Sequence, residues 1–327
     1  MQSFATITIH ESQWPEALTR ELHDNLRRGS INHKFLYESP RQVRQWLKLH
    51  ELYSPARREA EFDSTYGAAF ATVRDQLGPG PVHVIGLGCG GGQKETALLH
   101  QLRSSQQHAT FTATDVSTGM VVTSLRAAWA HVDPTQCAGV VCDLALATDL
   151  EGCLNIQTHR GARRVLTFFG MIPNFEPAVT QSLLGKLLRP GDLLLCSANL
   201  APGRDYRRGV EAVLPQYDNA ATRDWLNLFH IDVGIEPDAG VLQFAIREEP
   251  PGGGLLRIEA TFEFSCDATA SVEGETFQYT SGDRLRVFFS YRHTPETLAN
   301  VLAGASLNLR QSWISSSGEE GVFLLER

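Results

Sequence analysis

The stretch that most constrains the fold is residues 82–103, where a short apolar run, a glycine-rich turn and a helical pattern follow one another. The β-branched run that begins at Val82 predicts a buried strand. The glycines at positions 86, 88 and 90 to 92 predict a tight turn, and residues 94–103 predict a helix. A backbone of this kind can approach a nucleotide-like ligand closely, although the glycine pattern alone fits a plain turn equally well.

Two acidic residues at later strand ends favour nucleotide binding. Residues 110–115 predict a second strand that ends in Asp115, whose carboxylate can accept both hydroxyls of a ribose. Residues 138–143 predict a third strand that ends in Asp143, placed to accept from an adenine amine while Leu144 packs on the ring. Either aspartate alone is more often a helix cap or a turn residue. Together, the three strand ends favour S-adenosylmethionine over NAD or no ligand.

The order of elements predicts an α/β fold. Strands and helices alternate over residues 82–199, as in a parallel sheet covered by helices on both faces. Ligands of such sheets bind over the carboxyl ends of the strands, and Asn174 follows the fourth of them. A helix after Thr294 and a terminal strand pair would complete the Rossmann-like sheet of a class I methyltransferase.

The alternation stops after residue 200, which predicts a second, α+β domain. Residues 205–232 have a helical pattern, and residues 241–292 have the pattern of antiparallel strands. We therefore expect four segments: an N-terminal segment, 1–62, that contributes to the substrate domain; a methyltransferase core, 63–202; an inserted substrate-binding domain, 203–292; and a C-terminal helix with strands, 293–327, that complete the core sheet.

Charge and cysteine usage exclude several classes of function. The net charge of −8, without a basic stripe, argues against a nucleic-acid substrate. No apolar run approaches the ~20 residues that cross a bilayer, and no signal-peptide pattern opens the sequence. The six cysteines lack CxxC spacing, which predicts reduced thiols and no metal site. We expect a cytoplasmic monomer that acts on a small molecule, without a nucleic-acid or membrane partner.

From about Asn32 to the C-terminus, the motifs resemble those of the histidine-specific methyltransferases, the S-adenosylmethionine-dependent enzymes of ergothioneine biosynthesis. Residues 168–174 resemble the asparagine motif that follows the fourth strand in the family, but the motif is one residue shorter in this chain and carries Pro173. Two tyrosine segments also match, around Tyr53 and Tyr217. The resemblance implies a cofactor site made of Gly88, Lys94, Asp115, Asp143 and Leu144.

The same resemblance implies how an amino acid would be held. Tyr53, Asn174 and Tyr217 match the family residues that grip the α-carboxylate of histidine. Hydroxyls and one amide supply the several donors that a buried carboxylate needs. Tyr37 matches a family tyrosine near the substrate amine, which makes it the catalytic candidate for orienting the amine or relaying its proton.

The chain departs from the family in residues 286–292. The family has a glutamate two residues before the serine that is Ser290 here, and these two groups bind the imidazole of histidine. Phe288 stands in the place of the glutamate and cannot accept from an imidazole N–H. We therefore expect an altered specificity, for another aromatic or related amino acid.

The predicted function is an S-adenosylmethionine-dependent N-methyltransferase that acts on the α-amine of an amino acid. The protein would align a neutral nitrogen with the methyl carbon for in-line displacement. One alternative is a true L-histidine Nα-methyltransferase of ergothioneine biosynthesis, and another is a cofactor-binding protein without catalysis. An NAD-dependent oxidoreductase is disfavoured by the second strand-end aspartate and by the insertion.

Overall fold

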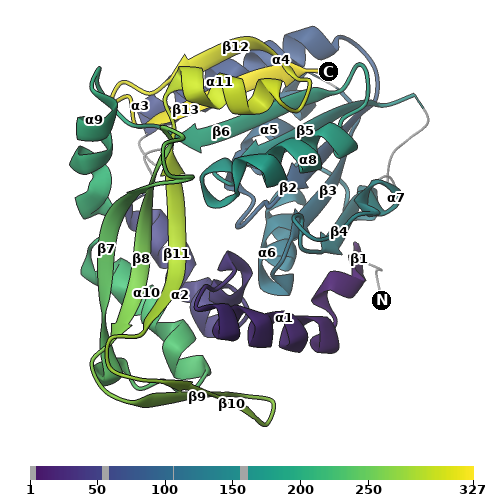
Figure 1. The fold of residues 1–327 in the computed structure, drawn as a ribbon. Coiled ribbons are helices and arrows are strands. Elements are labelled where there is room, and N and C mark those ends of the chain that lie inside the picture. The colour runs from purple at the N-terminus through teal and green to yellow at the C-terminus, as the bar shows by residue number, and fades with distance from the viewer. Residues whose placement is uncertain (1–4, 54–58, 106, 155–160) are drawn as a thin grey trace. The chain divides into compact units, whose positions relative to one another are not determined.

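The computed structural model of the protein describes residues 5–53, 59–105, 107–154 and 161–327 (Figure 1). The side chains of Tyr53, Glu59, Ala60 and Asp63 lie outside this description. The described residues form two compact units. The core unit comprises residues 5–12, 59–200 and 293–327, and the second unit comprises residues 13–53 and 201–292.

An eight-stranded sheet forms the centre of the core unit, in the order β1-β4-β3-β2-β5-β6-β13-β12 (Figure 1). The first six strands of this order run parallel, and the last two are antiparallel to their neighbours. This order confirms the predicted Rossmann-like sheet of a class I methyltransferase. The strands are β1 (Thr6–Ile9), β2 (Val82–Leu87), β3 (Ala109–Asp115), β4 (Cys137–Val141), β5 (Arg163–Phe169), β6 (Leu193–Asn199), β12 (Asn308–Ile314) and β13 (Glu320–Glu326).

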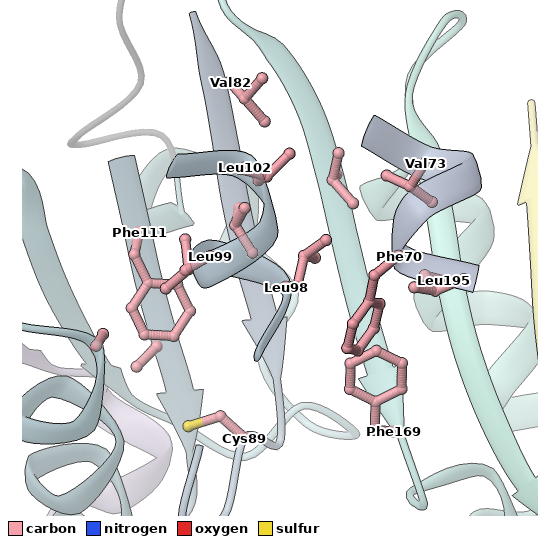
Figure 2. Close-up of a cluster of buried hydrophobic side chains, with 14 of the residues drawn as sticks. Phe70, Val73, Val82, Cys89, Leu98, Leu99, Leu102, Phe111, Phe169 and Leu195 are labelled. Carbon is pink, nitrogen blue, oxygen red and sulfur yellow. The ribbon is translucent and has the colours of Figure 1, made fainter. Parts of the chain in front are cut away.

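Helices cover both faces of this sheet. Alternate residues of a strand point to opposite faces, and in β2 the apolar side chains on both faces are buried against helices. Val82 and Val84 of β2 pack in one buried cluster with side chains of α4, α5 and α6 (Figure 2). Ile85 and Leu87 pack in a second cluster with side chains of α7, α8 and α11. The helices are α3 (Glu59–Phe62), the π-helix Asp63–Gly67, α4 (Ala68–Leu77), α5 (Gln93–Ser104), α6 (Thr118–Ala128), α7 (Leu150–Leu154), α8 (Pro177–Leu187) and α11 (Pro295–Ala303).

The second unit contains an antiparallel sheet in the order β11-β8-β7 and the hairpin β9-β10. Its buried cluster joins Leu26, Trp225 and Phe229 from helices to Phe262 and Phe288 from strands. The strands are β7 (Gly240–Glu248), β8 (Leu256–Phe264), β9 (Ala268–Val272), β10 (Glu275–Tyr279) and β11 (Arg284–Arg292). The helices are α1 (Pro15–Arg28), α2 (Pro40–Tyr53), α9 (Tyr206–Val213) and α10 (Ala220–Asp232).

One feature of the N-terminal region differs from the expectation. β1 pairs in parallel with β4 and joins the core sheet, whereas the sequence pattern placed all of residues 1–62 with the substrate domain. An alternating run predicts a strand, but not which sheet it joins. Within the described ranges, every helix is too short or too polar to cross a lipid bilayer.

Gly139, in the middle of β4, lacks room for a side chain. A Cβ atom there would lie 2.5 Å from Cγ1 of Val121 and 3.2 Å from Cγ1 of Ile7. We expect Gly139→Ala to lower the free energy of unfolding by about 1–3 kcal/mol through overpacking. Urea unfolding would measure the change. In Gly152→Ala, the control in α7, the added Cβ meets nothing within 4 Å, so stability should stay equal or rise slightly. Equal losses in both variants would contradict the packing argument.

Candidate functional site

The turn after β2 depends on glycine. Gly88, Gly90 and Gly92 have φ angles of 66°, 51° and 73°, in the left-handed region that side chains disfavour. A Cβ at Gly88 would also lie 2.7 Å from Met171, and a Cβ at Gly92 would lie 2.4 Å from Oγ of Ser124. Both the backbone conformation and the packing therefore require glycine in this turn.

Asp115, at the end of β3, is bonded to that turn. Its Oδ2 accepts from the backbone N–H of Gly90 at 2.9 Å, and its Oδ1 accepts from the N–H of Ser117 at 3.0 Å. Burial raises the pKa of Asp115 to about 6, so the carboxylate is ionised at neutral pH. Two backbone donors set the orientation of this ionised carboxylate, which is therefore suited to accept hydrogen bonds from hydroxyl groups of a ligand.

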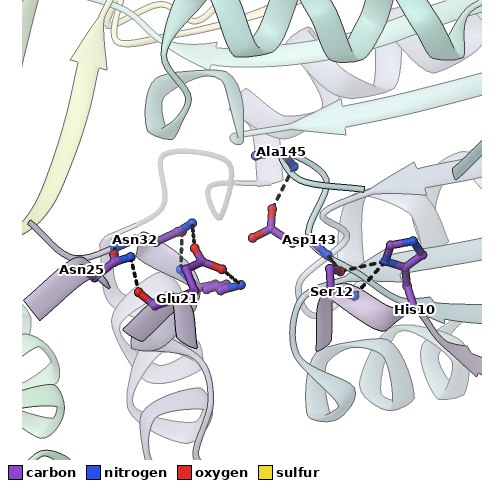
Figure 3. Close-up of polar contacts among 8 residues, drawn as sticks. His10, Ser12, Glu21, Asn25, Asn32, Asp143 and Ala145 are labelled. Atoms are coloured by element: carbon purple, nitrogen blue, oxygen red, sulfur yellow. Dashed lines mark hydrogen bonds and ion pairs between the residues drawn. The ribbon is translucent and has the colours of Figure 1, made fainter. Parts of the chain in front are cut away.

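Asp143 lies two residues beyond β4, at the carboxyl end of that strand, and Figure 3 shows its contacts with Ser12 and Ala145. Its Oδ1 accepts from the N–H of Ala145 at 2.8 Å, and its own N–H donates to Oγ of Ser12 at 3.0 Å. Asp143 and Leu144 are both 4% exposed. The Cys142 N–H donates to the Asp115 carbonyl at 3.0 Å, which joins the two strand ends. The turn thus offers an oriented carboxylate next to an apolar side chain.

The ammonium group of Lys94, predicted to contact the cofactor, is held inside the core unit. Its Nζ lies 3.1 Å from Oε1 of Glu320 and 4.5 Å from the ring centroid of Tyr66. The Tyr66 hydroxyl donates to the same carboxylate oxygen. Burial and the neighbouring Glu320 raise the pKa of Tyr66, which keeps the phenol neutral and able to donate. No sequence pattern indicated Tyr66 or Glu320, since neither lies near Lys94 in the chain.

Glu95, the residue after Lys94, is a buried acid that the sequence pattern did not reveal. It is 2% exposed, and Oγ1 of Thr167 donates to its Oε1 at 3.0 Å. A Cβ added at Gly86 of β2 would lie 3.3 Å from its Cγ, so the glutamate packs against the end of this strand. Burial raises the pKa of Glu95 to about 7. A carboxyl group that titrates near neutrality therefore lies beside the end of β2, the strand that precedes the glycine turn.

Asn174 ends a 3₁₀ helix, Ile172–Asn174, that follows β5. Its N–H donates to the Met171 carbonyl at 2.9 Å. Met171 is the side chain that any Cβ at Gly88 would strike, so the turn that carries Asn174 lies beside the glycine turn. The position of Asn174 beyond a strand end is as predicted.

Tyr217 and β11 form a polar cluster in the second unit. The Tyr217 hydroxyl lies 3.0 Å from Oγ of Ser290 and accepts from a guanidinium nitrogen of Arg292 at 2.8 Å. The Tyr217 ring centroid lies 6.1 Å from that of Phe288. Ser290 and Arg292 are only 1% and 4% exposed. Arg292 was not among the predicted site residues, although its spacing of two from Ser290 along the strand places both on one face.

Aromatic rings surround Phe288 in the second unit. The His33 ring is stacked on it with centroids 5.0 Å apart, and the Trp225 ring lies at 6.0 Å. Tyr37 lies 5.5 Å from Trp225 and 5.7 Å from Trp46. Tyr37 and Phe288 therefore belong to one aromatic wall, with Trp225 between them.

The predicted site residues divide between the two units. Tyr53 is the last residue of α2, and its side chain lies outside the described residues. In the part of the chain that the structure describes, no group of histidine, cysteine and acidic side chains could hold a metal ion. The polar groups of the core unit fit a nucleoside, because oriented carboxylate acceptors lie beside a glycine-rich turn. The core unit carries Gly88, Lys94, Asp115, Asp143, Leu144 and Asn174, and the second unit carries Tyr37, Tyr217, Phe288 and Ser290.

Comparison with known proteins identifies a methyltransferase family. A family model described as histidine-specific methyltransferase, SAM-dependent, matches residues 16–327. A search of curated protein sequences found no match. Similar solved structures include the magnesium protoporphyrin IX methyltransferase of Synechocystis with bound S-adenosylhomocysteine (12% identity, 90% of this chain and 97% of that one, TM-score 0.46). Another is the 1,6-didemethyltoxoflavin N1-methyltransferase of Burkholderia thailandensis (14% identity, 88% and 90%, TM-score 0.40). At such low scores, the fold assignment rests on the strand order of this chain.

Glu95 should make the free energy of unfolding depend on pH. Because its folded pKa of about 7 exceeds the ordinary 4.5, the native state binds more protons between these values, and stability falls as pH rises through them. Glu95→Gln keeps an acceptor for Thr167 without the ionisation. We expect this variant to be more stable than the native protein at pH 8, by up to about 3 kcal/mol, and to have a flatter pH profile.

Urea unfolding at pH 5 and pH 8 would measure the effect of Glu95→Gln. Glu211→Gln, at an exposed position on α9, is the matched control and should leave the native profile unchanged. Parallel profiles for Glu95→Gln and the native protein would show that the buried carboxyl does not titrate as described.

Proposed function

Because this chain belongs to the histidine-specific, S-adenosylmethionine-dependent methyltransferases, we propose that it methylates the α-amine of an amino acid. The observation that carries the proposal is the cluster of Tyr217, Ser290 and Arg292 beside the ring of Phe288. It combines donors for a carboxylate with an apolar aromatic surface, and an aromatic amino acid presents both kinds of group.

Arg292 and Tyr217 support recognition of the substrate carboxylate. The Tyr217 hydroxyl accepts from Arg292, so its own hydrogen is directed away from the guanidinium, and Oγ of Ser290 lies 3.0 Å from its oxygen. A hydroxyl polarised by a guanidinium is a stronger donor, and the positive charge favours an anion nearby. Asn174 and Tyr53 are proposed as further donors on the family pattern.

Phe288 supports an altered side-chain specificity. A glutamate at this position would accept from a ring N–H, whereas the phenylalanine leaves an imidazole N–H without an acceptor. The rings of His33, Trp225 and Phe288 instead offer stacking to an apolar aromatic side chain. L-Histidine is the second candidate, because the description of the family and the retained Ser290 favour it.

Tyr37 is the proposed catalytic residue. S-adenosylmethionine supplies an electrophilic methyl group on a sulfonium, and the attacking amine must be neutral. Tyr37 would orient the amine and pass its proton toward solvent, with its ring held between Trp46 and Trp225. Alignment of the amine with the methyl group would then be the main contribution of the protein.

The proposed cofactor site uses the carboxyl ends of β2, β3 and β4. Asp115 would accept from the ribose hydroxyls, and Asp143 from the exocyclic amine of adenine, with Leu144 against the ring. Gly88 and Lys94 complete the proposed set. The six free cysteines support a cytoplasmic location for this activity, and the net charge of −8 supports a small molecule rather than a nucleic acid as substrate.

Removal of the Asp115 carboxylate should weaken cofactor binding. We expect Asp115→Ala to raise the Kd for S-adenosylhomocysteine roughly 10- to 100-fold, because charged acceptors contribute about 1.5–3 kcal/mol per hydrogen bond. Native affinity should fall as pH is lowered through about 6, where Asp115 becomes protonated, and the variant should lack this dependence. Calorimetry measures both effects, with the exposed Asp75→Ala as control. An unchanged Kd in Asp115→Ala would refute the ribose assignment.

The substrate proposal predicts turnover of apolar aromatic amino acids. Labelled S-adenosylmethionine would be incubated with histidine, tryptophan, tyrosine and phenylalanine, and kcat/KM compared for the native protein, Phe288→Glu and the apolar control Phe288→Leu. We expect Phe288→Glu to shift the preference toward histidine by about 10-fold or more, because an acceptor for the ring N–H is restored. Exclusive turnover of histidine by the native protein would refute the altered specificity. Methylation of none of the amino acids tested would refute the function itself.

A further inference from the structure

An N-terminal strap, defined here as residues 6–12, adjoins the turn that carries Asp143. It precedes residues 16–327, the part of the chain that the family model matches. β1 pairs in parallel with β4, with Ile9 opposite Val141. The His10 N–H then donates to the Val141 carbonyl at 2.9 Å. The hydrogen bonds between the two segments thus continue to Val141, two residues before Asp143. The strap therefore follows β4 up to the candidate adenine site.

Ser12 and His10 form a directed chain of hydrogen bonds from this turn. Oγ of Ser12 accepts from the Asp143 N–H at 3.0 Å and lies 2.9 Å from Nδ1 of His10 (Figure 3). The Ser12 N–H also donates to Nδ1, at 3.1 Å, so this nitrogen is an acceptor and the neutral ring carries its proton on Nε2. Nε2 donates to Oδ1 of Asp149 at 2.7 Å. The Ser12 hydroxyl thus donates to His10 while it accepts from Asp143.

Burial makes the inner end of this series of hydrogen bonds, at Asp143, sensitive to substitution of Ser12. Asp143 is 4% exposed and His10 is 8% exposed, whereas the Asp149 side chain is 73% exposed. Loss of the Ser12 hydroxyl would remove the acceptor that the structure gives to the buried Asp143 N–H. Oδ1 of Asp143 is bonded to the Ala145 N–H, so a shift of this backbone would reorient the carboxylate.

We propose that Ser12 and His10 are positioning residues that hold the Asp143 carboxylate in the orientation that selects an adenine with an exocyclic amine. This inference rests on the proposed function, in which Asp143 accepts from that amine. In this role, Ser12 and His10 act through Asp143. The expected consequence is specific, because a carboxylate accepts from an amine but is opposed by a carbonyl oxygen at the same position of the base.

The test compares two ligands in the full-length protein. S-adenosylhomocysteine carries the amine, and S-inosylhomocysteine carries a carbonyl oxygen in its place. We expect the native protein to prefer the adenine compound, and Ser12→Ala to lose roughly 5- to 10-fold of that preference, as one hydrogen bond is removed. Ser12→Thr, which retains a hydroxyl, should restore the preference. Ile9→Thr, on the same strand at a 52% exposed position, should behave as the native protein does.

The outcomes separate this inference from the function on which it rests. A native preference that Ser12→Ala retains in full would overturn the role of the strap while leaving the Asp143 assignment intact. A native protein that binds both ligands equally, together with an unaffected Asp143→Ala, would overturn the adenine assignment and the inference with it. A loss of affinity for both ligands by the same factor in Ser12→Ala would also overturn it, because such a loss reports general destabilisation.

Discussion

The hydrogen bond from the Gly90 N–H to the Asp115 carboxylate holds together the turn after β2 and the end of β3. It forms only because the glycines adopt left-handed backbone angles that bring the turn close to its neighbour. The bond orients a charged acceptor at the edge where ligands of parallel sheets bind. Burial of Asp115 and of Glu95 disfavours their ionised forms. Ionisation of these two acids therefore lowers the stability of the fold, while it provides an oriented charge near the ligand-binding edge.

The frame around that edge includes the last strand of the chain. Glu320, at the start of β13, holds the ammonium group of Lys94 and accepts from Tyr66, which belongs to a π-helix. Single π-helical turns occur frequently at functional sites. The antiparallel C-terminal strands thus do more than complete the sheet, since β13 supplies the carboxylate that joins the helix after the glycine turn to the segment before β2.

In the second unit, a bulge in β11 decides which side chains meet. The register between β11 and β8 shifts between Arg286 and Phe288, and beyond the shift Phe288, Ser290 and Arg292 all contact Tyr217. A bulge redirects the side chains that follow it. The guanidinium is a strong donor beside the hydroxyl, and the phenylalanine adds an apolar ring. A cationic donor and an apolar ring are therefore neighbours on one strand.

Local sequence determined the strands of the core, the glycine turn and the acids at Asp115 and Asp143, because strand ends and turns leave a short-range pattern of residue types. The departure from the family pattern at Phe288 could also be recognised from the sequence alone. Only the tertiary structure decided that β1 pairs with β4, that Glu320 meets Lys94 across 226 positions, and that Ser12 meets Asp143 across 131. Such contacts depend on how separate elements pack, and neither periodicity nor spacing along the chain records that packing.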